Sequence, residues 1–301
     1  MRPFITHSPE EVHQSAVKLG AVDRENDWGG LVRPHVLLMA GEHADSAEKL
    51  VQAIGGKILE KQQNRDQVRY LVSHGGSEFN ILVAGLGAES VESALREYND
   101  ALKTSGSRKG YVIRMGSAGG LQENVNIGDS FIVNEGLDFS AATSFSERRR
   151  THPIPRVILG MVPRLKRHLY NNFGLTGDLQ KAAGRLSIVT KTGRCASVGT
   201  FGHFVMRREN GGIVPVRSEW GNASAVKTYS RLLGKIKAGA QDMESAAIAA
   251  YIKHSGMNLK YGAVLGISDH LLKPGEWHPF NPLVRPFMIA VEAILGDIQA
   301  K

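Results

Sequence analysis

One stretch, residues 112–133 (VIRMGSAGGLQENVNIGDSFIV), constrains the fold of this chain more than any other. Its first residues have the apolar character of a buried strand, and the small residues at 116–120 predict a tight turn after it. Glycine lets the backbone approach a ligand closely, so that N–H groups can point at negative charge. Arg114 and Ser117 would add a guanidinium and a hydroxyl, the donors that phosphate and carboxylate groups prefer. The alternative is a glycine-rich turn between strands with a surface arginine.

The size of the chain predicts one large domain. At 301 residues with 42% apolar content, it can bury a full core. No low-complexity segment, repeat or linker interrupts the pattern, so we predict a single domain over residues 1–301. Within it, residues 1–33 form an N-terminal extension and residues 139–156 a basic loop insertion.

Cysteine usage and hydropathy indicate a soluble protein of a reducing compartment. Cys195 is the only cysteine, which excludes an internal disulfide and a cysteine-based zinc site, and we expect its thiol to be inert. The N-terminus lacks the apolar core of a signal peptide, and no apolar run approaches the roughly 20 residues that span a bilayer. We therefore expect a cytoplasmic protein with no membrane partner.

The net charge of +8 does not by itself indicate nucleic-acid binding. The basic residues are spread along the chain, and the one tight triplet, at residues 148–150, is typical of a solvated loop. No recognisable nucleic-acid module accompanies them, so we expect no nucleic-acid partner. Small anionic substrates account for part of the excess charge equally well.

Hydrophobic periodicity predicts alternating strands and helices, and hence an α/β fold with a central mixed sheet flanked by helices on both faces. Ligands on such sheets bind where strands end and glycine-rich loops begin, here at 40–45, 85–90, 116–120 and 266–270. The predicted strands are 35–40, 68–73, 79–84, a strand ending at 114, 130–133, 185–189 and 261–267. The predicted helices are 44–54, 90–104, 156–171, 223–236, 243–254 and one from 283 onward.

Four motifs in order, RMGSAGG (114–120), GDS (128–130), DMES (242–245) and GISDH (266–270), give the chain a family resemblance. From roughly residue 34 to 297 it resembles the nucleoside phosphorylase superfamily, of the purine nucleoside phosphorylase and uridine phosphorylase type. The resemblance implies a pentosyltransferase that cleaves the N-glycosidic bond of a nucleoside with phosphate. The products would be the free base and ribose 1-phosphate. Phosphate would be a co-substrate, and no cofactor or metal would be needed.

The resemblance also implies a phosphate site shared between subunits. Arg114 and Ser117 would bind the phosphate, and Gly41 would supply a backbone N–H. Arg65 matches an arginine that these enzymes donate into a neighbouring subunit's site. We therefore expect a homo-oligomer, a dimer or a hexamer, whose partners are nucleoside and phosphate. Without the resemblance, Arg65 is typical of an exposed salt-bridging residue.

The ribose and the base would be held by three further segments. In the family pattern, Glu244 binds the sugar hydroxyls and Met243 packs on the sugar, while Asp242 replaces the usual first glutamate. Acids near a helix start are otherwise common without any ligand. Phe201 matches an aromatic residue beside the base, and Arg207 matches an arginine with which uridine phosphorylases read the pyrimidine.

Asp269 favours a purine substrate, because purine-specific members carry this aspartate as an acid near the base. A carboxylic acid that protonates the leaving base would stabilise its developing negative charge, and partial burial can keep such an acid protonated near neutral pH. Asp269 and Arg114 are therefore the candidate catalytic residues. The alternative for Asp269 is a helix N-cap.

One departure from the family pattern leaves the reaction open. Asp45 stands where these enzymes have an arginine on phosphate, and an acid there would repel the anion. A compensating base such as His43 would preserve phosphorolysis. A hydrolytic nucleosidase, with Glu42 or Asp45 activating water, is one alternative. Uridine phosphorylase, which Arg207 favours, and a catalytically silent nucleoside-binding protein are the others.

Overall fold

The computed structural model describes the backbone of residues 31–39, 44–64, 67–85, 87–107, 109–138, 169–197, 204–209, 212–218, 235–270 and 281–300. Side chains are described in the same segments except at residues 44, 64, 88, 89, 204–209, 212–218 and 281.

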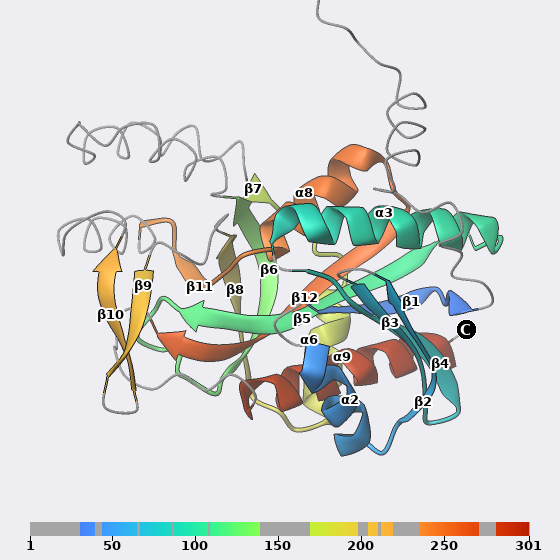
Figure 1. Cartoon of the computed structure of the whole chain (residues 1–301), viewed down its shortest axis with the longest axis horizontal. Coiled ribbons are helices and arrows are strands. Elements are labelled where there is room, and N and C mark those ends of the chain that lie inside the picture. The colour runs from blue at the N-terminus through green and yellow to red at the C-terminus, as the bar shows by residue number, and fades with distance from the viewer. Residues whose placement is uncertain are drawn as a thin grey trace, which may run out of the picture.

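A large mixed sheet is the centre of the fold (Figure 1). Its strands follow the order β11-β8-β6-β12-β5-β1-β4-β3-β2, with β7 paired to β6. These strands are β1 (His35–Met39), β2 (Lys57–Asn64), β3 (Gln67–His74), β4 (Ser77–Val83), β5 (Gly110–Gly120), β6 (Ser130–Asp138), β7 (Leu169–Tyr170), β8 (Thr190–Ser197), β11 (Ala238–Asp242) and β12 (Leu259–His270). A separate antiparallel pair consists of β9 (Phe204–Glu209) and β10 (Gly212–Ser218).

The middle of the sheet is parallel and buried. β4, β1, β5 and β12 run in the same direction, and every residue of β1 is buried. Parallel strands covered on both faces need near-continuous apolar runs, and HVLLM in β1 has that character. The outer part, β2-β3-β4, is an antiparallel meander instead. The central strands therefore bring their carboxyl ends to one edge of the sheet.

β5 exchanges its neighbour partway along its length. On one side it pairs with β12 over its whole length, from Gly110 to Gly120. On the other side it pairs with β1 as far as Arg114 and with β11 from Gly119. Since β11 also pairs with β8, the strands β11, β8, β6, β12 and β5 close into a ring. Among the described residues, no strand pairs with residues 115–118 on the β1 side of β5. This open interval lies where parallel strands end.

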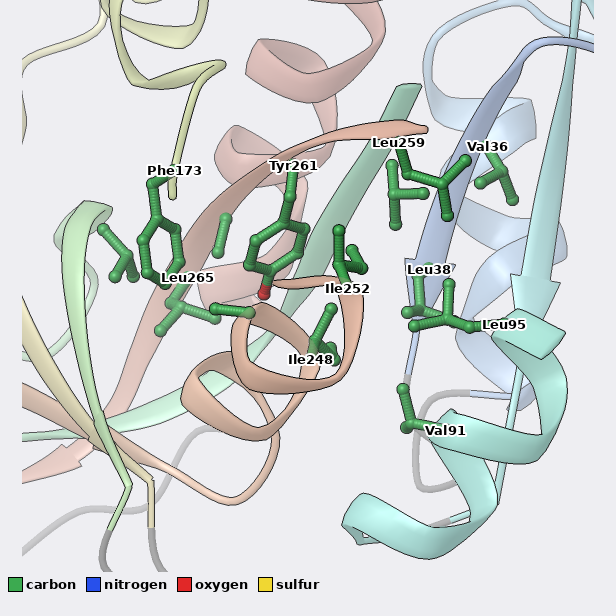
Figure 2. Packing of buried hydrophobic residues seen from close by; sticks show 14 of the residues in the cluster. Val36, Leu38, Val91, Leu95, Phe173, Ile248, Ile252, Leu259, Tyr261 and Leu265 are labelled. Atoms are coloured by element: carbon green, nitrogen blue, oxygen red, sulfur yellow. The ribbon is translucent and has the colours of Figure 1, made fainter. Parts of the chain in front are cut away.

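Helices cover both faces of the sheet (Figure 1). Figure 2 shows Val91 and Leu95 of one helix and Ile248 and Ile252 of another in a single apolar cluster with strand residues, including Tyr261. A second cluster joins the other helices to the opposite face. None of the described helices is long and apolar enough to cross a membrane. On the first face lie α3 (Ala88–Thr104) and α8 (Ser245–Ser255), and on the second α2 (Ala44–Ala53), α6 (Thr176–Arg185) and α9 (Asn281–Gln299).

The predicted α/β class is confirmed, and local signals placed several elements well. β1, α2, α3 and α9 lie within a few residues of their predicted bounds. Gly75 and Gly76 have φ values of 58° and 77°, and they link β3 to β4 in the predicted hairpin. Gly55, at φ 70°, follows α2 as expected for a left-handed helix end.

Two of the predicted glycine-rich loops are wrong. Residues 116–120 continue β5, and residues 266–270 continue β12, because the two segments pair with each other over their full length. Gly119 faces Asp269, and Gly120 faces His270, in this pairing. Small residues predicted a turn, but a neighbouring strand 150 positions away in sequence stabilises them in extended form.

Helix α6 and its surroundings also differ from the prediction. Residues 185–189, predicted as a strand, contain the end of α6 and the turn after it, and β8 begins only at Thr190. Leu179, Ala182 and Ala183 form the buried side of this helix. The predicted helix 156–171 ends in β7 instead, and its earlier part lies outside the described residues, as do most of 223–236 and the insertion 139–156. β2 was not predicted.

Candidate active site

Arg114 lies at the start of the open interval of β5, and its side chain is buried, with only 1% exposed. The guanidinium Nη2 donates to Glu244 Oε2 at 2.7 Å, and Nη1 donates to the carbonyl of Met115. The side chain lies over Gly116, where an added Cβ would come within 2.6 Å of Arg114 Cζ. Only glycine at 116 therefore leaves room for the guanidinium. Nε of Arg114 has no hydrogen-bond partner within the described residues.

The carboxylates around Arg114 keep it charged despite its burial. Burial alone lowers the pKa of an arginine, but the carboxylates of Glu244 and Asp242 more than offset this, and the pKa of Arg114 is raised above its ordinary value. The pair of Arg114 and Glu244 is thus a cation and a carboxylate held out of water. Such a pair is held together strongly, but bringing it into the interior costs free energy.

Glu244 lies between β11 and α8, and it is 2% exposed. Its Oε1 accepts the backbone N–H of Gly87 at 3.1 Å, while Oε2 accepts Arg114. A carboxylate has about four lone-pair positions. Each oxygen of Glu244 therefore keeps capacity for a further donor. Gly87 precedes α3, so three segments far apart in sequence meet at this carboxylate.

Asp242, the last residue of β11, is turned into a separate network. Oδ1 accepts the Ser197 hydroxyl at 2.6 Å and the Cys195 thiol at 3.5 Å. Both Asp242 oxygens lie within hydrogen-bond distance of the Ser245 backbone N–H, at 3.2 and 3.0 Å. Oδ2 also accepts the Ser245 hydroxyl. The acceptor capacity of Asp242 is accordingly taken up by protein groups.

The two weak acids beside Asp242 stay protonated. Burial raises the pKa of the Cys195 thiol well above its ordinary value, and the charge of Asp242 raises it further. The pKa of the Tyr261 hydroxyl is raised in the same way, mainly by burial and further by the charge of Asp242. Both groups therefore keep the proton that they donate to their acceptors. The Tyr261 hydroxyl donates to the carbonyl of Ser245 at 3.2 Å.

Asp269 approaches β5 from β12 at a bulge. The pairing register shifts between Ile267 and Asp269, and bulges of this kind re-aim side chains near functional sites. The Asp269 carboxylate accepts the Ser268 hydroxyl at 2.9 Å and lies over Gly119, where a Cβ would stand 3.2 Å from Oδ2. Side chains alternate along β5, so Gly119 faces the side opposite to Arg114. The side chains of Arg114 and Asp269 thus lie on opposite faces of β5.

The structure brings together only part of the predicted site. Met243 is half-buried beside Glu244, and Ser117 lies in the open interval of β5. Arg207 is in β9, where only the backbone is described. The predicted residues Gly41, Arg65 and Phe201 lie outside the described residues. Their roles stay predictions.

Sequence reasoning missed two contributors. Gly87 falls within the loop predicted at 85–90, but nothing in the sequence pairs it with a carboxylate 157 positions later. Ser197 carries no motif, and its contact with Asp242 follows only from the parallel pairing of β8 with β11. Asp45 is exposed in the first turn of α2, where the helix dipole stabilises a negative charge.

Comparison with known proteins identifies the family of this chain. The protein-family model of the phosphorylase superfamily matches residues 36–283, which include the open interval of β5, the contact of Arg114 with Glu244, and Asp269. A search of curated proteins found no match. The matched segment is most of the chain, and it spans the sheet from β1 through β12. The chain therefore belongs to the phosphorylase superfamily.

Proposed function

We propose that this protein is a nucleoside phosphorylase, which cleaves an N-glycosidic bond with phosphate to give free base and ribose 1-phosphate. The contact between buried Arg114 and Glu244 at the open interval of β5 carries this proposal. A buried cation and a buried carboxylate with spare hydrogen-bonding capacity suit a ligand that has both an anionic group and hydroxyl groups. Family membership gives such a site its expected reaction class.

Each partner of the pair would bind one reactant. Arg114 has an unpartnered Nε–H, and a guanidinium binds phosphate oxygens well. Ser117 and the backbone N–H of Gly41 would complete the phosphate site, together with Arg65 from a neighbouring subunit of a homo-oligomer. Glu244 would accept the ribose hydroxyls, and Met243 would pack on the sugar.

The reaction passes through an oxocarbenium-like ribosyl transition state. A phosphate oxygen attacks C1′ while the bond from C1′ to the base nitrogen breaks, and its electron pair leaves with the base. Asp269 donates a proton or a hydrogen bond to a purine nitrogen and so stabilises the departing base. Phe201 would order the base. No redox cofactor or metal takes part.

Asp269 is the reason to favour purine nucleosides. Arg207 supports uridine phosphorylase as the second candidate. Asp45 supports a hydrolytic nucleosidase, although its place in the first turn of α2 gives an acid there a structural role as well. A silent nucleoside-binding protein would bind without turnover. We propose a cytoplasmic location and no nucleic-acid or membrane partner.

Release of free base from inosine, adenosine and uridine, each with and without phosphate, tests the proposal. Phosphate-dependent release supports the proposal. Cleavage of inosine or adenosine would support the purine specificity that Asp269 suggests, and cleavage of uridine would support the specificity that Arg207 suggests. Release of base at the same rate without phosphate would show that the reaction is hydrolysis, not phosphorolysis. No release from any of the three overturns the proposal. Glu244→Gln should lower base release, because it removes the carboxylate proposed to bind the ribose. Glu78→Gln is its matched control, because Glu78 forms an ion pair with Arg33 at the surface.

A further inference from the structure

The N-terminus of α8 has an unusual cap. Glu244 occupies the N-cap position, but its side chain makes no cap hydrogen bond, since it is turned toward Arg114 and Gly87. The first N–H groups of a helix have no partner within the helix and need one from elsewhere. Here the Ser197 hydroxyl accepts the N–H of Ala246 at 2.8 Å. Asp242 accepts the N–H of Ser245.

Ser197 and Asp242 are also bound to each other. They are paired residues at the ends of the parallel strands β8 and β11, and the Ser197 hydroxyl donates to Asp242 Oδ1 at 2.6 Å. Both residues are buried, at 2% and 6% exposed. One hydroxyl therefore donates to the carboxylate and accepts from the helix at the same time. These hydrogen bonds join β8, β11 and the first turn of α8 into one connected unit.

This unit fixes the backbone on both sides of Glu244. Asp242 is held two residues before it, and Ser245 and Ala246 are held directly after it. Tyr261 of β12 holds the carbonyl of Ser245 as well. Freed from capping, the Glu244 side chain can serve the site, because the two neighbouring strand ends do the capping in its place.

We propose that Ser197 and Asp242 are positioning residues, which set the place of Glu244 against the sugar without touching the substrate. The proposal rests on the function proposed above, in which Glu244 binds the ribose hydroxyls. In this proposal Asp242 does not bind the sugar, because protein donors already occupy its carboxylate oxygens. The oxygens of Glu244, in contrast, can each accept a further hydrogen bond. A displacement of about 1 Å in such a group can lower a rate by about 10²-fold.

The test compares a ribonucleoside with its 2′,3′-dideoxy counterpart, which lacks the hydroxyls that Glu244 would bind. In Ser197→Ala we expect kcat/KM for the ribonucleoside to fall about tenfold or more, with little change for the dideoxy compound. Ser197→Thr keeps the hydroxyl and should restore much of the ratio. In a Glu244→Gln background, Ser197→Ala should have little further effect, since residues that act through one another are not additive.

Thr176→Ala is the matched control. Like Ser197, Thr176 has a hydroxyl that links a helix start to the sheet, but it does so at α6, where it donates to the backbone carbonyls of Val133 and Phe173. Its loss should lower stability without changing the ratio of the two substrates. An unchanged ratio in Ser197→Ala, whether both substrates keep their activity or lose it equally, overturns the inference. Full additivity with Glu244→Gln overturns it as well. Wild-type protein that cleaves no nucleoside overturns the proposed function itself.

Discussion

Two ion pairs in this molecule have nearly the same length and opposite surroundings. Arg114 and Glu244 are 2.7 Å apart with side chains 1% and 3% exposed, whereas Lys61 and Glu48 are 2.8 Å apart with side chains 47% and 42% exposed. The first pair lies at the carboxyl ends of the central strands, and the second lies between β2 and α2 at the outer part of the sheet. Distance alone therefore says little about what a pair contributes.

Water makes the difference between them. An exposed pair is screened and contributes little to stability, and its partners lose little when separated. A buried pair has lost its hydration, so each partner depends on the other. Replacing both partners by apolar groups often leaves stability unchanged. Placing a buried pair at the end of strands thus favours a role in function over one in stability.

The largest expected effect comes from breaking the buried pair. Arg114→Met leaves the Glu244 carboxylate without its cation, and we expect a loss of about 3–5 kcal/mol in the free energy of unfolding. The double variant Arg114→Met with Glu244→Leu should regain most of that loss. Both should lack phosphate-dependent base release. Urea unfolding measures the first effect, and a double variant no more stable than the single one would contradict the comparison.

Asp269 is half-buried, whereas Glu244 is buried, so a variant at this position extends the comparison. Asp269→Asn removes the proton donor and keeps the shape, so we expect kcat/KM for purine nucleosides to fall by about 10²-fold. Activity on uridine should change far less. Base release from inosine and uridine by the same variant gives both values, and equal losses would remove Asp269 from the base site.

Gly116→Ala tests the space that the buried pair needs. The added methyl would collide with the Arg114 guanidinium, and overpacking of this kind typically lowers stability by about 1–3 kcal/mol. Activity should fall with it as the guanidinium shifts. Gly184→Ala in α6 is the control, because nothing lies within 4 Å of its added Cβ and alanine favours a helix. Similar stabilities for the two variants would argue against the crowding at Gly116.

The smallest effect belongs to the exposed pair, and it depends on pH. The hydrogen bond from Lys61 and its charge lower the pKa of Glu48. A lowered folded-state pKa stabilises the protein above the unfolded pKa of about 4.3, and this contribution is lost as pH falls through the folded value. Lys61→Met should therefore lower Tm by at most about 2 °C at pH 7 and less near pH 3. Thermal unfolding at both pH values decides it.

The sequence predicted correctly those turns and helix ends that depend only on residues close together in the chain. The hairpin at Gly75 and Gly76 and the end of α2 at Gly55 follow from backbone freedom, which the sequence shows directly. The extended form of Gly119 depends on Asp269 of another strand, and the cap of α8 depends on Ser197. Such contacts arise only after the chain has folded, so residue type alone could not reveal them.

The same limit applies to the site. Arg114, Glu244 and Asp269 were predicted as site residues from motif order. The structure adds that the first two touch, while the third lies on the other face of β5. Asp242 was expected near the sugar because of its motif. Its engagement with Ser197 and Ser245 became visible only when the pairing of β8 and β11 was known.

The closed ring of strands has a consequence for self-association. Because β11 pairs with both β8 and β5, the strand order of the large sheet does not end in a free strand at β11, whereas its other end, β2, is a free edge in the described part of the chain. β2 carries Lys57 and Lys61 and a register shift between Ile58 and Glu60. Charges and bulges at an edge oppose the addition of another strand. Addition of another strand at β2 is thereby opposed, so we expect this edge to stay out of any contact between subunits.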